Sequence, residues 1–377
     1  MKIGILGGGP AGLSFAYLMK QQNPDHQITV IEQNPRGATW GFGVVFSGTA
    51  LNHVEGADPD IFAKLMARAE SWDDITIGLG DEQVPIDGNR FAAISRLDLL
   101  LDLIDLCEGV GVDIKFDQRC DDLTQFDEFD LIVGSDGLNS ILRTAHEDKF
   151  GTKINTLTNA FAWYGTTKLF DTLTLTFRKV PEGAFVAHHY RYSKSMSTFL
   201  VECDAATFER NGFADMSDEA SRKLCEQIFA HELDSHSLIS NNTSWRKFPA
   251  ITNEKWTYKN MIILGDAAHT AHFSIGSGTR LAMEDAAILS QAFATVGDDV
   301  EQAFVEFERV RTPQVNTILK AAAGSYNWYE GFASRLDMTP YELAYDYMTR
   351  SGRIDDTRLR KIAPKFMADY DVQMTRA

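Results

Sequence analysis

A glycine-rich turn directly follows the first apolar segment of the chain, and it restricts the fold more than any other feature. Residues 2–6 read as a short buried strand with an apolar run from Ile3 to Leu6, and residues 7–12 follow with the spacing G-x-G-x-x-G. Residues 13–22 have the pattern of a helix, and residues 28–32 have that of a second buried strand. A strand, a tight turn, a helix and a second strand within about 30 residues predict a βαβ unit that opens a Rossmann-like sheet.

Each of the three glycines in the motif has a physical reason to lack a side chain. Gly7 permits the sharp turn, Gly9 lets backbone amides approach a pyrophosphate, and Gly12 lets the helix pack closely on the strand. Glu32 ends the second strand, where an acid is expected to receive ribose hydroxyls, and it favours FAD or NAD over NADP at this site. The candidate dinucleotide-binding residues of this segment are Gly7, Gly9, Pro10, Ala11, Gly12 and Glu32.

A second glycine-rich segment lies far along the chain. Residues 261–264 read as a buried strand, Asp266 follows its end, and Gly276 and Gly278 precede a helix that opens near Thr279. A carboxylate just past a strand can accept from a sugar hydroxyl, and a helix N-terminus attracts a phosphate or a flavin. The alternative is an ordinary strand-turn-helix in which the aspartate only caps.

Two further polar positions are candidates for the same site. Residues 130–137 read as a strand that ends in Asp136-Gly137, for which the alternative is a common turn. Arg96 opens a predicted helix over residues 96–107, for which the alternative is a solvated arginine at a helix start.

The middle of the chain changes character. Residues 166–177, 185–192 and 197–203 alternate apolar and polar side chains, as half-exposed antiparallel strands do. Residues 36–47 read as a loop, and residues 218–233 as one helix capped by Ser217.

The predicted fold class is therefore α/β with an α+β insertion: a Rossmann-like domain, an antiparallel β-sheet substrate domain and a C-terminal helical segment. The expected boundaries are 1–70, 90–154 and 255–320 for the dinucleotide-binding domain, 71–89 and 155–254 for the substrate domain, and 321–377 for the C-terminal helices.

Composition narrows the partners. The chain of 377 residues has a formal net charge of −17, which argues against nucleic acid or an anionic membrane as the main partner. Its four cysteines form no C-x-x-C pair and no cluster with zinc spacing, so we expect reduced thiols and no metal. No apolar run approaches the length of a membrane span, and we expect a cytoplasmic protein, monomeric or homodimeric.

In their order along the chain, the three motifs resemble those of the single-component FAD-dependent aromatic hydroxylases of the para-hydroxybenzoate hydroxylase type. The resemblance covers about residues 1–320. Residues 40–47 and 269–278 are further similar to the hydroxylase part of salicylyl-CoA hydroxylases and their aminobenzoyl-CoA relatives. Residues 163–166, 185–192 and 196–203 are similar to the hydroxylase of the violacein pathway, which acts on an indole skeleton.

The resemblance implies the cofactors and several residue roles. FAD is held with its ADP half on the first glycine turn and Glu32, Asp266 holds the ribityl chain and pyrophosphate, and Arg96 faces the same region. The Asp136-Gly137 motif serves FAD and NAD(P)H together, so NADH or NADPH needs no second Rossmann domain, and O2 is the co-substrate. The implied cofactor-binding set is Gly7, Gly9, Pro10, Ala11, Gly12, Glu32, Gly43, Arg96, Asp136, Asp266, Gly276, Gly278 and Thr279.

The candidate substrate pocket lies in the β insertion and in the loops near the flavin. His188, Tyr190 and Tyr192 alternate along one strand and so share a face, which makes either a ring-binding wall or an ordinary domain face. His269 and His272 flank the second glycine motif, and one of them can polarise a substrate hydroxyl, whereas His269 can also be structural. The catalytic candidates are His269, His272, His188 and Tyr190, and the substrate candidates are Phe46, Trp163, Tyr164, Tyr192 and Phe273.

The expected activity is an NAD(P)H-consuming monooxygenase that hydroxylates an aromatic ring through a flavin hydroperoxide. The resemblance favours an aromatic acyl-CoA such as salicylyl-CoA. The alternatives are an indole- or tryptophan-derived substrate, an FAD oxidase or dehydrogenase that inserts no oxygen, and a flavin-binding regulator without turnover.

Overall fold

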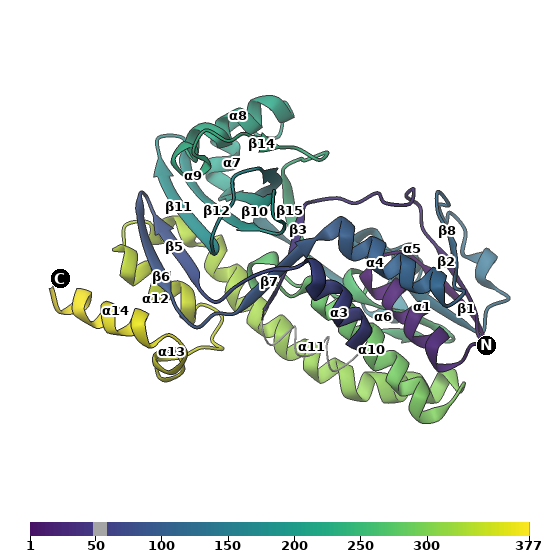
Figure 1. Ribbon diagram of the computed structural model, residues 1–377. Coiled ribbons are helices and arrows are strands. Elements are labelled where there is room, and N and C mark those ends of the chain that lie inside the picture. Colours follow the sequence, from purple (N-terminus) through teal and green to yellow (C-terminus); the bar gives the residue numbers. More distant parts are fainter. Residues whose placement is uncertain (48–58, 377) are drawn as a thin grey trace.

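The computed structural model describes residues 1–47 and 59–376, which form two large sheets and a small three-stranded sheet, together with long helices (Figure 1). The first sheet has six strands in the order β16-β17-β9-β1-β2-β8 and is parallel except for the edge strand β16. Its strands are β1 (Lys2–Leu6), β2 (Gln27–Ile31), β8 (Asp113–Lys115), β9 (Leu131–Gly134), β16 (Thr257–Tyr258) and β17 (Met261–Ile263). This is the predicted Rossmann-like sheet.

Helices pack against this sheet because its strands are apolar on both faces. Helix α1 contacts both α4 and α10, and α10 contacts the long helix α11. The helices of this half are α1 (Pro10–Gln22), α3 (Pro59–Arg68), α4 (Arg96–Gly109), α5 (Ile141–Ala145), α6 (Glu147–Phe150), α10 (Gly278–Val296) and α11 (Val300–Glu330). The 3-10 turns are η1 (Leu123–Phe126), η2 (Gly137–Asn139), η3 (Gly265–Ala267) and η4 (Phe273–Ile275).

The second sheet has eight strands, in the order β14-β10-β13-β12-β11-β5-β6, with β15 also paired to β10. All its pairs are antiparallel except β5 with β11, because β5 and β6 enter from a separate part of the chain. The strands are β5 (Ile75–Leu79), β6 (Glu82–Ile86), β10 (Lys153–Thr166), β11 (Leu173–Val180), β12 (Gly183–Arg191), β13 (Ser197–Cys203), β14 (Leu238–Ile239) and β15 (Arg246–Thr252). One face is covered by α7 (Ala205–Asn211), α8 (Asp218–Ile228) and α9 (Ala230–Leu233).

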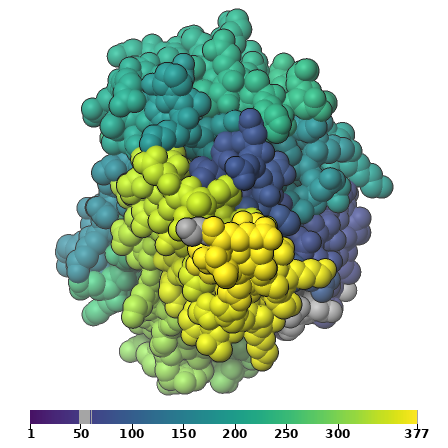
Figure 2. Space-filling model, turned by 90° about the vertical axis from the view of Figure 1, so that its left-hand side faces the viewer, coloured from purple at the N-terminus to yellow at the C-terminus, as the bar shows by residue number. Residues whose placement is uncertain are grey.

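The C-terminal helices complete the other side of this sheet. They lie against the hairpin β5–β6, as the yellow and blue surfaces of Figure 2 show, and share one apolar core with it and the end of α11. They are α12 (Pro340–Thr349), α13 (Asp356–Ile362) and α14 (Pro364–Arg376), after the short turn η5 (Phe332–Arg335). Among the described residues no helix is both long and apolar enough to cross a membrane.

Three local predictions are wrong. Residues 43–47, expected in a loop, form strand β3 (Gly43–Ser47), which pairs with β7 (Phe91–Ser95), itself paired to β4 (Glu70–Trp72). The expected strand 166–177 is instead the end of β10, a turn and the start of β11. The helix expected over 218–233 breaks at Phe229, whose backbone leaves the helical region between α8 and α9.

Candidate active site

The first glycine turn has the close contacts that its spacing predicts. Gly7 has a φ of +94°, and a Cβ there would lie 2.5 Å from the carbonyl oxygen of Ser135. A Cβ on Gly12 would lie 2.3 Å from the carbonyl oxygen of Gly7. Gly9 differs, because the nearest atom to its Cβ position is the Ser135 oxygen at 3.9 Å. The turn is therefore closed against protein at Gly7 and Gly12 and open at Gly9, where α1 begins.

Glu32 fixes the shape of this turn. Its Oε2 accepts a hydrogen bond from the Gly8 amide at 2.7 Å, and its Oε1 accepts from the Asn34 amide at 2.8 Å. Oε1 also accepts from Asn34 Nδ2 at 2.6 Å, whereas Oε2 keeps a second lone pair. The geometry therefore suits a carboxylate that organises the loop and can also accept from a ribose.

The second glycine segment meets the first across the end of the sheet. Gly265 has a φ of +59°, and its Cβ position lies 3.3 Å from the Cβ of Ala11 at the start of α1. Pro10 and Ala11 thus take part in this junction as the first residues of α1. Gly276 has a φ of +56° and closes the turn η4. The two segments, more than half the chain apart, form one cradle.

Several groups in the cradle lack partners within the described chain. Helix α1 has Gly9 at its N-cap and α10 has Ser277, and neither N-terminus is capped by a side chain. The buried atoms Arg96 Nε and Asp136 Oδ1 have no hydrogen-bond partner. Free helix N-termini bind phosphate groups, and a buried guanidinium seeks an anion.

The charges of Asp266 and Arg96 influence each other in this cradle. The Asp266 side chain is exposed, yet surrounding protein raises the pKa of its carboxyl, while Arg96 and His269 oppose the shift. A carboxyl that solvent can reach and whose pKa is nevertheless raised by surrounding protein is typical of a concave site. Burial also raises the pKa of Asp136, although Ser140 and the Ile141 amide oppose it. These residues, the open Gly9 and the open start of α10 at Gly278 and Thr279 fit FAD, with the carboxylates placed for sugar hydroxyls.

His269 does not face this cleft as a free base. Its Nε2 lies 2.8 Å from Asp285 Oδ2, and Asp285 Oδ1 accepts from Arg311 Nε at 2.7 Å. The Gly265 amide donates to the same Asp285 carboxylate at 2.8 Å. All three side chains are almost fully buried. The expectation of a catalytic His269 is therefore corrected: it belongs to a buried ion-pair network that supports the turn carrying Asp266.

The face of the second sheet that meets η4 is aromatic with one polar pair. Phe161 and Trp163 of β10, His188 of β12 and Glu202 of β13 share this face, because Glu202 pairs with Phe161 and Leu200 pairs with both Trp163 and His188. Phe273 of η4 contacts it, with ring centroids 4.8 Å from Phe161 and 5.4 Å from His188. The face thus meets the loop that follows Asp266.

Tyr164, expected at the substrate, points to the opposite face. It is 1% exposed among the residues under α8, and its hydroxyl lies 3.3 Å from Ser221 Oγ. Side chains alternate along a strand, so its neighbour Trp163 lies on the face that meets η4. The expectation that Phe46 contacts the substrate is also corrected, because Phe46 is 3% exposed within the core of the Rossmann-like half.

His188 and Glu202 form the polar pair. His188 Nε2 lies 3.5 Å from Glu202 Oε2, and both atoms are buried and otherwise unpartnered within the described chain. The other carboxylate oxygen accepts from Asn159 Nδ2 at 2.9 Å, and the His188 ring stacks on Tyr329 of α11 at 5.2 Å. The sequence pattern found His188 but gave no sign of Glu202, Asn159 or Tyr329, since buried polar residues on distant elements have no shared local pattern.

Tyr190 and Tyr192 hold the start of strand β3 at Gly43. The Tyr190 hydroxyl donates to the Gly43 carbonyl at 2.9 Å, and the Gly43 amide donates to Thr198 Oγ1 at 2.9 Å. The Tyr192 ring occupies the space that a Cβ on Gly43 would need, at 2.4 Å. Burial raises the pKa of Tyr190 above its usual value. The Tyr190 hydroxyl is therefore protonated and already hydrogen-bonded to Gly43. The expectation of a catalytic Tyr190 is corrected, because this side chain holds strand β3 in place.

His272 sits beside Phe273 and is neutral. Burial lowers the pKa of His272 to about 3, with His188 and Arg350 adding to the shift. Its Nδ1 lies 2.8 Å from Ser274 Oγ. At neutral pH it is a hydrogen-bond donor or acceptor and carries no charge.

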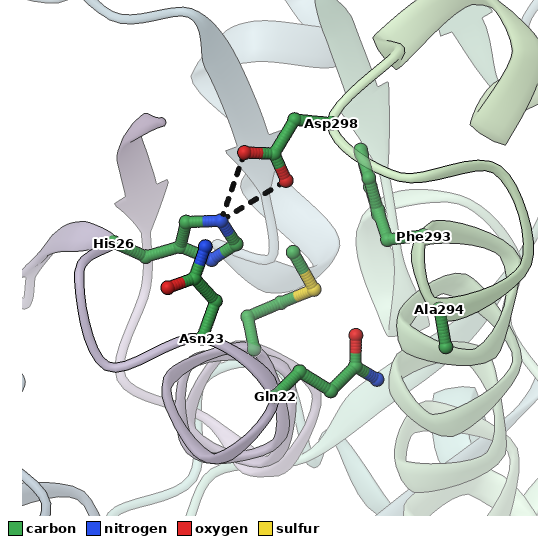
Figure 3. Close-up of a pocket in the computed structure, with 7 residues that line it drawn as sticks. Gln22, Asn23, His26, Phe293, Ala294 and Asp298 are labelled. Atoms are coloured by element: carbon green, nitrogen blue, oxygen red, sulfur yellow. Dashed lines mark hydrogen bonds and ion pairs between the residues drawn. The ribbon is translucent and has the colours of Figure 1, made fainter.

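A separate hollow of about 330 Å³ lies away from these residues. It is lined by Met19, Gln22, Asn23, His26, Phe293, Ala294 and Asp298, and Figure 3 shows His26 paired with Asp298 across it. His26 precedes β2, so the hollow lies at the end of the parallel sheet opposite the glycine turn. Within the described part of the chain, no three His, Cys, Asp or Glu residues are grouped so that they could hold a metal ion.

Comparison with known proteins agrees with this geometry. The model of the family described as an FAD binding domain matches residues 107–322, and that of an NAD(P)-binding Rossmann-like domain matches residues 5–57. The salicyloyl-CoA 5-hydroxylase of a Streptomyces species is 38% identical over 93% of this chain and 70% of its own length. The protodeoxyviolaceinate monooxygenase of Chromobacterium violaceum is 32% identical over 93% of this chain and 94% of its own length.

A third relative and a solved structure extend the comparison. The 3-hydroxy-4-methyl-anthranilyl-[aryl-carrier protein] 5-monooxygenase of Streptosporangium sibiricum is 33% identical over 94% of this chain and 95% of its own length. The fold matches 2-methyl-3-hydroxypyridine-5-carboxylic acid oxygenase with a TM-score of 0.70, 19% identity and coverage of 95% and 97% of the two chains. With its FAD cradle, aromatic sheet face and these relatives, the chain belongs to the FAD-dependent aromatic monooxygenases, which use NAD(P)H and O2.

Proposed function

We propose that the chain hydroxylates the ring of an aromatic acyl thioester, with salicylyl-CoA as the leading candidate. By their names, two relatives act at ring position 5, one on a salicyloyl-CoA and one on an anthranilyl group carried by a protein. Salicyloyl and anthranilyl groups carry an OH or NH2 at position 2, which is para to position 5. A donor para to the attacked carbon raises the electron density there.

The observation that carries this proposal is the polar pair on an otherwise aromatic face. Phe161, Trp163 and Phe273 offer flat apolar surface to a ring, and His188 with Glu202 is the one ionisable pair that this face presents among the described residues. A substrate with a single OH or NH2 on its ring matches that surface.

The roles follow from the geometry. When bound in the cradle and reduced by NAD(P)H, FAD would activate O2 for transfer of one oxygen atom to the ring. Glu202 faces Nε2 of His188 and stabilises positive charge there, so Nδ1 is the atom that accepts the proton of a substrate OH or a hydrogen bond from a substrate NH2. Phe273 and Phe161 hold the ring and exclude water from it. Deprotonation then increases electron density at the para carbon.

A second candidate is an indole-derived substrate. The protodeoxyviolaceinate relative is similar over nearly the whole of both chains, and an indole also has a flat ring system with one N–H. The same aromatic face and His188 suit it.

The test measures NAD(P)H consumption by the purified FAD-loaded protein with salicylyl-CoA, free salicylate or an indole, and product mass for one added oxygen. Oxygenated product from the thioester alone supports the proposal. Oxygenation of the indole alone supports the second candidate instead. Oxygenation of free salicylate at an equal kcat/KM would overturn the thioester requirement.

A further inference from the structure

The C-terminal helices reach the loop that carries Phe273 through one side chain. Arg350, at the end of α12, donates from Nη2 to the Ser274 carbonyl at 2.8 Å and from Nε to Ser325 Oγ at 2.9 Å. Its Nη1 donates to the Tyr347 carbonyl at 2.7 Å, and the guanidinium lies 3.6 Å from the centre of the Tyr347 ring. A planar guanidinium with three fixed acceptors has one orientation.

These contacts continue to His272. Ser325 Oγ lies 2.8 Å from Ser274 Oγ, which lies 2.8 Å from His272 Nδ1. Because Arg350 can only donate, Ser325 accepts from it and is free to donate its own proton to Ser274, which then donates to Nδ1. The Ser274 amide also points at Nδ1, at 3.3 Å. Nδ1 is therefore an acceptor, and the ring proton of His272 resides on Nε2.

The packing of α11 makes this contact possible. A Cβ on Gly324 would lie 3.3 Å from the carbonyl oxygens of both Arg350 and Ser351. A glycine inside a helix costs about 1 kcal/mol relative to alanine. Here it allows the chain after α12 to approach α11 closely enough for Arg350 to reach past it.

Charges around His272 act in the same direction. His188 faces it from β12, with Glu202 of β13 behind, Tyr326 and Tyr329 face it from α11, and Arg350 lies behind the two serines. Positive charge on His188 or Arg350 disfavours an imidazolium at His272. A neutral ring with fixed tautomer results.

We propose that Arg350 is a positioning residue of the active site: through Ser325 and Ser274 it fixes the loop Phe273–Ile275 and holds His272 as the Nε2–H tautomer. The C-terminal segment is then part of the reaction centre as well as of the fold. This rests on the proposed function only in placing η4 beside the substrate.

The direct test is 15N NMR of the histidine side chains, with and without FAD, in wild type and in Arg350→Met, using His272→Asn to assign the signals. The expected wild-type pattern is an unprotonated Nδ1 and a protonated Nε2 for His272. In Arg350→Met a mixture of tautomers should appear, and Arg350→Lys should fall between. A wild-type ring protonated on Nδ1, or an unchanged pattern in Arg350→Met, overturns the relay.

Kinetics test the consequence. We expect Arg350→Met to lower the hydroxylated product formed per NAD(P)H severalfold, with Arg350→Lys partly restoring it. The matched control is Arg335→Met, because Arg335 also lies over an aromatic ring (Trp328, 5.1 Å) and pairs with Asp346 at 2.8 Å, but no contact joins it to η4 in the described chain.

The outcomes separate the two proposals. If wild type oxygenates an aromatic and Arg350→Met keeps the same coupling, the positioning role is wrong and the function stands. If wild type oxygenates none of the tested aromatics, the function fails, whereas the NMR result still decides the relay. Should Arg350→Met not fold by circular dichroism, Arg350→Lys carries both measurements.

Discussion

At the scale of single residues, the two histidines of the second glycine-rich segment have different roles although they are only three positions apart. His269 is paired with a buried aspartate, and His272 is hydrogen-bonded to a serine. His188 faces Glu202 at the aromatic sheet face. Their neighbours therefore decide their roles: the carboxylate beside His269 is held in a buried network with Arg311, whereas the carboxylate beside His188 lies at the aromatic sheet face.

We expect His188→Gln to lower kcat for hydroxylation by about 100-fold, because glutamine cannot accept the substrate proton. Tyr164→Phe is the control, since its hydroxyl lies on the opposite face of the sheet, 3.3 Å from Ser221 Oγ, and it should keep kcat within about twofold while losing about 1 kcal/mol of stability. Steady-state kinetics with product quantification provide the measurement. Equal kcat values for His188→Gln and wild type would remove the base assignment.

Asp266→Ala should lose FAD, because the carboxylate is the accessible acceptor in the cradle. The absorbance ratio of bound flavin to protein after gel filtration measures this. Asp298→Ala, in the distant hollow of Figure 3, serves as the control and should retain FAD. Normal flavin content in Asp266→Ala would refute the placement of the second glycine segment.

The buried network under His269 predicts a dependence on pH. Burial alone would raise the pKa of Asp285, but His269 and Arg311 outweigh it and the pKa is lowered. A carboxyl with a lowered pKa stabilises the fold above its unfolded-state pKa of about 4, and this is lost as pH falls through the folded value. Asp285→Asn should therefore cost about 3–5 kcal/mol at pH 7. Urea denaturation at pH 7 and below pH 4 should show this gap narrowing; a constant gap would contradict the ion-pair account.

At the scale of elements, strand β3 and the substrate sheet interlock through glycines. Gly43 lies under Tyr192, and a Cβ on Gly165 of β10 would lie 2.4 Å from the Phe42 ring. Each of these contacts is possible only because one of the two residues is a glycine. These two contacts therefore fix the position of residues 42–43 relative to the second sheet.

Gly43→Ala should disturb this junction. Overpacking against Tyr192 is expected to cost about 1–3 kcal/mol and to weaken FAD binding, because β3 is displaced. Gly109→Ala, at the end of α4 with nothing within 4 Å of its Cβ position, should leave both unchanged or slightly improved. Thermal unfolding and flavin titration measure the two effects, and an unperturbed Gly43→Ala would show that the loop can move away.

The elements of the Rossmann-like half were predictable because each has a strong local signal. The strand, glycine turn and helix around Gly7 follow from adjacent residues, and the fold class is confirmed. Other positions depend on strand pairing: Tyr164 and Trp163 are equally aromatic, and only the pairing of β10 with β13 decides which of them lies on the same sheet face as Glu202. Strand β3 was missed because its partner β7 is distant in sequence. Glu202 and Arg350 depend on tertiary contacts alone.

At the scale of the whole molecule, the excess of acidic residues acts on stability. A net charge of −17 repels itself in the compact state, and salt screens this repulsion over about 10 Å at 0.1 M. We expect Tm to rise as NaCl increases from 0.01 to about 0.3 M at pH 7, measured by differential scanning calorimetry. Near the isoelectric point, pH ≈ 4.9, the rise should vanish. A falling Tm at pH 7 would mean that individual surface ion pairs outweigh the net repulsion.

The hairpin β5–β6 has its apolar partners at the far end of the chain. Asp87, just after β6, accepts a hydrogen bond from the amide of Phe366, 279 positions later, at 3.0 Å. During synthesis on the ribosome, residues 75–86 therefore emerge long before the helices that cover them. Formation of such contacts is slow because a long loop must close first. We therefore expect this hairpin to become native only after the helices from α12 onward have been made, and shorter translation products to expose it to chaperones.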